Sequence, residues 1–212
     1  MDHAPRFSRR ETLKAGAAIA ASVALPAALA AQAPARLKLR LLETTDLHVN
    51  VVPYDYFRDA ADDTVGLAKT ANLIKAAQAE ARNSLLFDNG DFLQGSSLGD
   101  YVAYKKGLKA GETHPMIAAM NALPYQCGTL GNHEFNYGLD FLEHGLARAE
   151  FPIVCANVER VGGGMLIEPW RIFEQSFEDE AGARHILIIA VIGFVPPQIM
   201  QWDKGHLERK VT

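Results

Sequence analysis

The sequence predicts a layered α/β domain, with central β-sheets flanked by helices, over residues 37–212. Two observations lead to this fold class. Short apolar runs alternate with amphipathic stretches from Arg36 onward, as in α/β layered domains. The run HILIIAVIGF, which ends at Phe194, is almost continuously apolar, and this is typical of a strand covered on both faces. The 212 residues are 49% hydrophobic and 22% charged, which favours a folded domain over a disordered chain.

The first half of the domain is expected to alternate strands and helices. LKLRLLET at Leu37–Thr44 predicts a first strand, and SLLFDN at Ser84–Asn89 predicts a second, buried one. Between them, Gly66–Arg82 carries Leu67, Ala71, Ile74 and Gln78 on successive turns, a helical spacing. Further helices are expected over Leu98–Lys106 and His114–Ala122.

The second half is expected to continue this alternation. YQCGTL at Tyr125–Leu130 predicts a third strand, Leu139–Ala149 a helix and Phe151–Ala156 a fourth strand. After a turn at 162–164, Arg171–Phe177 and Arg184–Phe194 predict two strands joined through the polar segment 178–182. No internal repeat is found.

The first thirty residues predict a targeting segment rather than part of the domain. SRRETLK precedes a weakly apolar, alanine-rich run, a layout that resembles a bacterial twin-arginine export signal with Arg9 and Arg10 as the pair. Thr12 stands where that pattern usually has Phe. The alternative is a membrane anchor, but the run contains Pro26 and is barely as long as a span requires. We expect cleavage near Ala30, a linker over 31–36, no stable membrane anchor, and export by the twin-arginine machinery to the periplasm.

The charge balance bears on nucleic-acid binding, and the cysteine count bears on disulfide bonds. Removal of residues 1–30 leaves 17 basic and 23 acidic residues, so the mature chain is mildly acidic. A duplex nucleic acid is therefore not an expected partner. Cys127 and Cys155 are too few for a disulfide framework, and two buried free thiols are favoured over a bridge. The oligomeric state does not follow from the sequence.

Polar groups follow the first three predicted strands. Asp46 and His48 follow the first strand, Asp91 follows the second, and Asn132 with His133 follows the third. The carboxyl ends of neighbouring strands meet at one edge of an open α/β sheet, where ligands bind. On an extended chain the two-residue spacing of Asp46 and His48 would turn both side chains to one face. Imidazole and carboxylate ligands suit Zn, Mn or Fe.

Each of these residues has a structural alternative. Asn and Asp commonly form turns, and a lone His is more often structural than a ligand. Asp88 is a further possible ligand, although a structural carboxylate is favoured because it would lie on the strand. The motifs D-x-H, G-D and G-N-H-E occur in this order, and each follows a predicted strand. Together they are far more specific evidence for a metal site than any one of them alone.

These three motifs resemble the first three of the calcineurin-like metallophosphoesterases. ETTDLH, DNGDFLQGSSLGDY, GNHEFNYGLDFL and IGFVPPQIMQWDK are similar to the branch of the 5′-nucleotidase family that acts on 2′,3′-cyclic nucleotides, over 39–212. The resemblance implies metal-dependent hydrolysis of nucleotide phosphoesters, as a 2′,3′-cyclic-nucleotide 2′-phosphodiesterase and 3′-nucleotidase. It also implies two divalent cations, of Mn, Zn, Fe or Co.

The resemblance also implies a role for each motif residue. Asp46 and His48 would ligate the first metal, Asp91 would bridge both, and Asn132 would ligate the second. His133 would stabilise developing charge or protonate the leaving oxygen. Many 5′-nucleotidases have Asp three residues after this histidine, where this chain has Asn136; an amide orients the ring without adding a negative charge. The cyclic-nucleotide branch also has Asn there.

The family's later histidine ligands have no counterpart after His133. His144 falls in a predicted helix, His185 begins a strand, and His206 follows a polar loop and is expected at the surface. We therefore expect the N-terminal portion of a longer enzyme, whose last strand would expose an apolar face or edge. A 5′-nucleotidase or UDP-sugar hydrolase, and a catalytically incomplete fragment, are the alternative interpretations.

Overall fold

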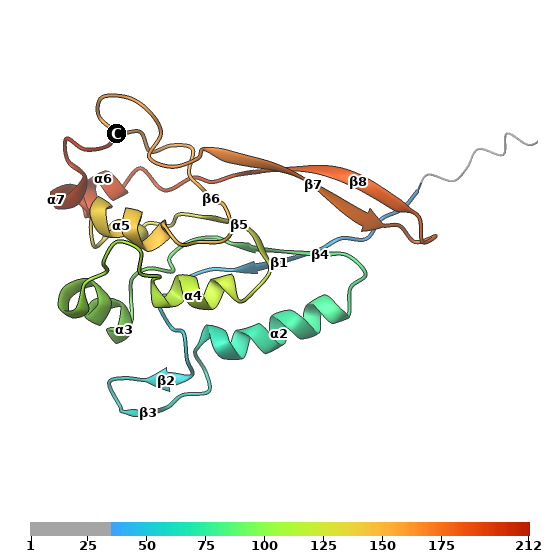
Figure 1. Cartoon of the computed structure of the whole chain (residues 1–212), viewed down its shortest axis with the longest axis horizontal. Coiled ribbons are helices and arrows are strands. Elements are labelled where there is room, and N and C mark those ends of the chain that lie inside the picture. Colours follow the sequence, from blue (N-terminus) through green and yellow to red (C-terminus); the bar gives the residue numbers. More distant parts are fainter. Residues whose placement is uncertain (1–34) are drawn as a thin grey trace, which may run out of the picture. The chain divides into compact units, whose positions relative to one another are not determined.

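The structure is a computed structural model that describes residues 35–212 (Figure 1). The predicted export signal and most of the predicted linker lie outside the described residues. Within 35–212, no helix has both the length and the apolar character needed to cross a membrane.

The central sheet has four parallel strands in the order β1-β4-β5-β6 (Figure 1). Their bounds are Arg40–Thr44 for β1, Ser84–Asp88 for β4, Tyr125–Thr129 for β5 and Ile153–Val154 for β6. Thr44 pairs with Asp88, and Asp88 pairs with Gly128, so the carboxyl ends of β1, β4 and β5 lie side by side. The prediction of an α/β fold is confirmed, and the sheet brings the three polar clusters to one edge.

Helices α2 (Leu67–Ala79) and α4 (Pro115–Asn121) pack together on one side of this sheet, below it in Figure 1. Their apolar stripes face inward, because Leu67 and Ile74 of α2 and Met116, Ile117 and Met120 of α4 are buried. The expected helix over 98–106 is short α3 (Ser97–Asp100), which continues as the π-helical η1 (Tyr101–Lys106). Helix α5 spans Leu139–Leu146.

The core lies between these helices and the sheet and extends beneath the loops at the carboxyl edge. Its largest fully buried apolar side chains are Leu86, Phe92, Leu93, Met116, Ile117, Met120, Leu130, Phe135, Leu142 and Leu207. Phe92, Leu93 and Phe135 belong to the loops that carry the polar motifs. Their burial fixes those loops to the domain, because each side chain loses apolar contact if its loop moves.

Strands β7 (Trp170–Glu178) and β8 (Arg184–Ile192) form an antiparallel hairpin on the other side of the sheet from α2 and α4 (Figure 1). The chain leaving β8 is joined to the central sheet region at Gly193, whose carbonyl accepts a hydrogen bond from the Ala156 nitrogen at 2.8 Å. A side chain at Gly193 would collide with Thr129.

The expectation that β8 is covered on both faces is wrong in this structure. The outer side chains of the hairpin are exposed, namely Trp170, Ile172, Ile186, Ile188 and Ile192. The reason is that β7 and β8 pair only with each other within 35–212, and no described element packs on their outer side. The expected exposed apolar face is therefore present on β7 and β8.

Several short elements were not predicted from the sequence. These are the ribbon of β2 (Tyr54–Asp55) and β3 (Ala60–Ala61), the 3₁₀-helix η2 (His133–Phe135), α6 (Ile199–Trp202) and α7 (Lys204–Leu207). Each is too short to show a hydrophobic period. Cys127 and Cys155 are both buried and free, as expected.

Candidate metal centre

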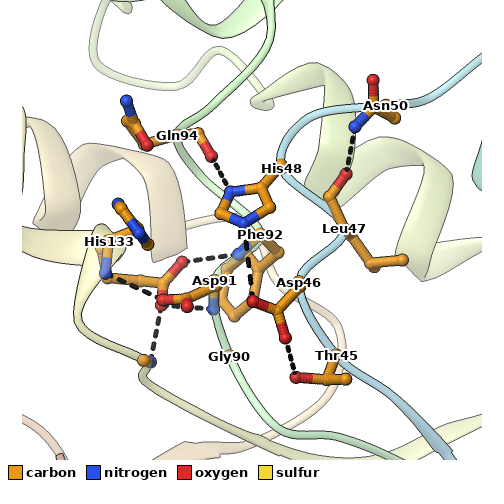
Figure 2. A network of polar contacts seen from close by, with 12 residues as sticks. Thr45, Asp46, Leu47, His48, Asn50, Gly90, Asp91, Phe92, Gln94 and His133 are labelled. Atoms are coloured by element: carbon orange, nitrogen blue, oxygen red, sulfur yellow. Dashed lines mark hydrogen bonds and ion pairs between the residues drawn. The ribbon is translucent and has the colours of Figure 1, made fainter.

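Three loops converge at the carboxyl edge of the sheet, and Figure 2 shows the side chains that they bring together. The loop after β1 carries Asp46 and His48, the loop after β4 carries Asp91, and η2 after β5 carries His133. The backbone nitrogen of Asp46 donates to the Gly90 carbonyl at 3.1 Å, and that of His48 donates to the Asp91 carbonyl at 2.9 Å. These bonds fix the first loop against the second.

Asp46 and His48 face each other, but not because the chain is extended. Both have left-handed backbone conformations, with φ of 53° and 47°, and they follow the end of β1 at Thr44. His48 Nε2 lies 3.5 Å from Asp46 Oδ1. The predicted pairing is thus present, while its predicted strand geometry is wrong: the chain turns in a tight loop that is held by the bonds to Gly90 and Asp91.

The other ring nitrogen of His48 is also engaged. Nδ1 lies 2.6 Å from the carbonyl oxygen of Gln94 (Figure 2). A carbonyl oxygen only accepts, so Nδ1 carries a proton, and Nε2 is the ring nitrogen that faces Asp46. Histidines that ligate metals are oriented in this way by a carbonyl on the second nitrogen. A side chain at Gly95, the next residue, would collide with this ring.

Asp91 lies between the second and third loops. It has a φ of 61°, and its Oδ1 accepts a hydrogen bond from the backbone nitrogen of His133 at 2.8 Å. Gly131 must be a glycine, because a Cβ there would collide with this same carboxylate. The hydrogen bond from His133 uses one lone pair of the Asp91 carboxylate, and the remaining lone pairs can accept other partners.

Glu134 holds the same two loops together through its side chain. Its Oε2 accepts from the backbone nitrogens of Asp91 (2.8 Å) and Gly131 (2.6 Å), and its Oε1 accepts from those of Phe92 (2.7 Å) and Leu93 (3.0 Å). The side chain is buried, and burial raises the pKa of its carboxyl while the N–H donors oppose that rise. A single carboxylate thereby positions the loops on both sides of the site.

His133 is linked to two residues from other parts of the chain. Its Nδ1 lies 2.7 Å from Oδ1 of Asn136, and the Nδ2 group of Asn136 donates to Oδ1 of Asp203 at 2.9 Å. The rings of His48 and His133 meet edge to face, with centroids 5.1 Å apart. Asp203 stands between α6 and α7 and is buried.

The residues present fit a divalent metal ion. His48, Asp91 and His133 can each offer one ligand atom, and these three atoms lie within 4.8 Å of one another. Imidazole and carboxylate are the ligands that Zn, Mn and Fe accept together. Asp46 is exposed and adjoins this cluster through His48, and Asn132 is half-buried at the start of η2, next to His133.

Other residues weighed in the sequence lie apart from this cluster. Both oxygens of Asp88 are engaged, since Oδ1 accepts from the Gly90 nitrogen and Oδ2 from the Thr44 hydroxyl, which agrees with a structural carboxylate. His144 is exposed and bonded to the Asp140 carbonyl, and His185 is bonded to Asp179. His206 is exposed and packs against Gly138, as expected of a surface histidine.

Sequence reasoning missed three residues that shape the site. Glu134 is part of the G-N-H-E motif, and its place directly after His133 was a usable signal. Gln94 acts through its backbone carbonyl, which no residue type reveals. Asp203 lies 67 positions from its partner Asn136, and no local pattern connects the two.

Comparison with known proteins agrees with this geometry. The sequence profile of the calcineurin-like phosphoesterases matches residues 39–197. The 2′,3′-cyclic-nucleotide 2′-phosphodiesterase/3′-nucleotidase of Yersinia enterocolitica is 54% identical over 84% of this chain, and that of Salmonella typhimurium is also 54% identical over 84%. The chain spans only 27% and 28% of these two relatives.

A solved structure shares the fold as well. The calcineurin-like phosphoesterase YfkN from Bacillus subtilis superposes with a TM-score of 0.79 at 48% identity, covering 84% of this chain and 54% of that one. The family profile spans most of the chain, and the motifs at its three strand ends meet in one cluster. The chain therefore belongs to the calcineurin-like phosphoesterase family.

Proposed function

We propose that this chain is the N-terminal part of an exported enzyme that hydrolyses nucleotide phosphoesters, opening 2′,3′-cyclic nucleotides at the 2′ bond and removing the 3′-phosphate. The observation that carries this proposal is the convergence of His48, Asp91 and His133 at the sheet edge. The relatives that are 54% identical over 84% of the chain and carry both activities in their names supply the substrate class.

The proposed centre holds two divalent cations, of Mn, Zn, Fe or Co. Asp46 and His48 would hold the first, Asp91 would bridge both, and Asn132 would hold the second. When bound, such ions polarise the phosphoryl group and acidify a water molecule. The rigid support for these ligands comes from the chain itself, through the Gln94 carbonyl on His48 and the four N–H groups on Glu134.

Hydrolysis adds water across the bond between phosphorus and a ribose oxygen. The water oxygen bonds to phosphorus, the bond to the ribose oxygen breaks, and that oxygen takes up a proton. His133 is proposed as the general acid that delivers this proton, and Asn136 is proposed to hold its ring. The first product keeps its 3′-phosphate, which makes it the substrate of the second hydrolysis.

A 5′-nucleotidase or UDP-sugar hydrolase is the second candidate. Snake venom 5′-nucleotidase of Naja atra is 34% identical over 59% of this chain. Asn136 favours the cyclic-nucleotide branch, because many 5′-nucleotidases have Asp at this place. Export to the periplasm remains a proposal based on Arg9 and Arg10, and so does recognition by the twin-arginine machinery.

The test is hydrolysis of 2′,3′-cyclic AMP, 3′-AMP and 5′-AMP by the purified chain with Mn²⁺. His133→Ala is compared with His144→Ala, which removes an exposed histidine outside the cluster. Turnover of the first two substrates that His133→Ala alone abolishes would support the proposal. Preferential turnover of 5′-AMP would favour the second candidate.

Metal uptake separates an incomplete centre from a non-catalytic domain. Mn²⁺ binding is measured by calorimetry for the chain, for His48→Ala and for His144→Ala. Two ions per chain, lost only in His48→Ala, would contradict a catalytically incomplete fragment. Uptake of a single ion without turnover would mean that the centre needs residues beyond the described domain, and equal uptake by all three proteins would refute the proposed ligands.

A further inference from the structure

Two hydrogen bonds link His133 to Asn136 and Asn136 to Asp203. The donor and acceptor groups of these three side chains fix which atom donates in each bond. An ionised carboxylate only accepts hydrogen bonds. Asp203 Oδ1 lies 2.9 Å from Asn136, so the amide must turn its NH₂ group toward Asp203. Its oxygen then faces His133 Nδ1 at 2.7 Å, and an amide oxygen also only accepts.

It follows that His133 Nδ1 must be the donor in this arrangement. Nδ1 keeps its proton whether the ring is neutral or charged, and Nε2 becomes the nitrogen at which a proton is gained or lost. The ring lies beside His48 and Asp91, where the proposed reaction needs a proton donor. Asn136 alone could not impose this, because an amide can present either end to a ring nitrogen.

We propose that Asp203 is a positioning residue that fixes the tautomer of His133 through Asn136. This inference rests on the proposed function for its catalytic meaning, while the tautomer itself is a property of the folded chain. Burial suits Asp203 to the role, because a bond between Asn136 and a buried carboxylate is strong. The Asp203 backbone is independently held by Ile199, His206 and Leu207.

The direct test is the ¹⁵N spectrum of the chain labelled in its histidine rings, recorded well above the ordinary histidine pKa of about 6.5. His133→Gln identifies the signals of His133. In the unaltered chain, Nδ1 of His133 is expected to be protonated and Nε2 bare. Asp203→Asn keeps the shape but allows either amide to turn over, so the proton is expected to move in part or entirely to Nε2.

A double variant tests whether the tautomer of His133 depends on the direction of these hydrogen bonds or on the packing of the side chain at position 203. The double variant Asn136→Asp, Asp203→Asn exchanges carboxylate and amide, and the new carboxylate at 136 accepts directly from Nδ1. It is expected to restore the Nδ1-protonated ring. Where the chain hydrolyses 2′,3′-cyclic AMP, Asp203→Asn should lower kcat about 10- to 100-fold with little change in KM, as for residues that orient a functional histidine through a hydrogen bond. The double variant should recover most of that loss.

The outcomes separate the two proposals. A tautomer that responds to Asp203→Asn would support the positioning role whether or not the chain hydrolyses 2′,3′-cyclic AMP, whereas turnover that survives in His133→Ala would count against the proposed function alone. An unchanged His133 spectrum in Asp203→Asn would overturn the positioning role whatever the activity. If Asp203→Asn does not fold, Asn136→Ala cuts the same link while keeping Asp203, and an unchanged tautomer there would overturn the inference equally.

Discussion

The buried carboxylate of Glu134 accepts a hydrogen bond from the backbone nitrogen of Asp91 at 2.8 Å, across a sequence separation of 43 residues. Three further backbone nitrogens, those of Phe92, Leu93 and Gly131, donate to the same carboxylate. The loop after β4 and the loop after β5 are therefore joined by one side chain. The relative placement of Asp91 and His133 depends on it.

Glu134→Gln should destabilise the fold and loosen the site. A glutamine replaces one accepting oxygen with an NH₂ group that faces two N–H donors, so at least one buried donor loses its partner. The expected loss is about 1.5–3 kcal/mol of unfolding free energy, the range for hydrogen bonds to a charged group. Urea denaturation measures it. Glu143→Gln, on the exposed face of α5, is the matched control and should cost little; equal effects of the two substitutions would contradict the role given to Glu134.

The sequence predicted the sheet and the convergence of the motifs for a physical reason. Buried parallel strands such as SLLFD are nearly continuous apolar runs, and parallel pairing requires their carboxyl ends to share an edge. It could not predict the left-handed loop at Asp46 and His48, because the backbone bonds to Gly90 and Asp91 that hold it come from a distant segment.

Contacts between residues far apart in the sequence could not be predicted either. Asp203, between α6 and α7, meets Asn136 at the end of η2 through one hydrogen bond, and these short helices show no period of their own. The exposure of Ile188 was partly foreseen, since the sequence indicated both a covered strand and an apolar face without a partner. The hydrophobic pattern of a strand shows which side chains could be buried. Whether they are buried depends on whether another element of the fold packs against them.

Asp88 should make stability depend on pH between about 4 and 7. Burial raises the pKa of Asp88 to about 7, against the partly opposing hydrogen bonds from Thr44 and Gly90. The folded chain then holds a proton that the unfolded chain has released, so the free energy of unfolding falls as pH rises through this window, by up to about 4 kcal/mol. Asp88→Asn removes the group that titrates. Denaturation of both proteins in EDTA across this range should show the parent losing free energy of unfolding relative to Asp88→Asn as pH rises, and a constant difference between the two proteins would refute the prediction.

His114 should have the opposite pH dependence. Its Nδ1 accepts from the Met116 nitrogen at 3.2 Å and caps α4, and burial lowers the pKa of the ring to about 4. Below a pH of about 6.5 the histidine of the unfolded chain binds a proton, whereas His114 of the folded chain stays neutral until about pH 4. The free energy of unfolding therefore decreases as pH falls from about 6.5 toward 4. His114→Asn keeps a capping side chain but removes the titration. The difference in unfolding free energy between variant and parent is therefore expected to change across this window and to be constant above it; a difference that is constant throughout would exclude His114 as the source.

The outer face of the β7–β8 hairpin should bind hydrophobic dye. Ile186 and Ile188 are 67% and 71% exposed and lie on the same side of β8, so their replacement removes apolar surface without opening a core cavity. Threonine keeps the branched Cβ that suits a strand. The double variant Ile186→Thr, Ile188→Thr should lower the fluorescence of a bound hydrophobic dye while changing the unfolding free energy by no more than about 0.5 kcal/mol. Ile189→Thr, which alters the half-buried inner side opposite Phe173, is the control and should cost more, about 1–2 kcal/mol, without a comparable drop in dye binding. Dye binding that survives the double variant would place the exposed apolar surface elsewhere on the chain.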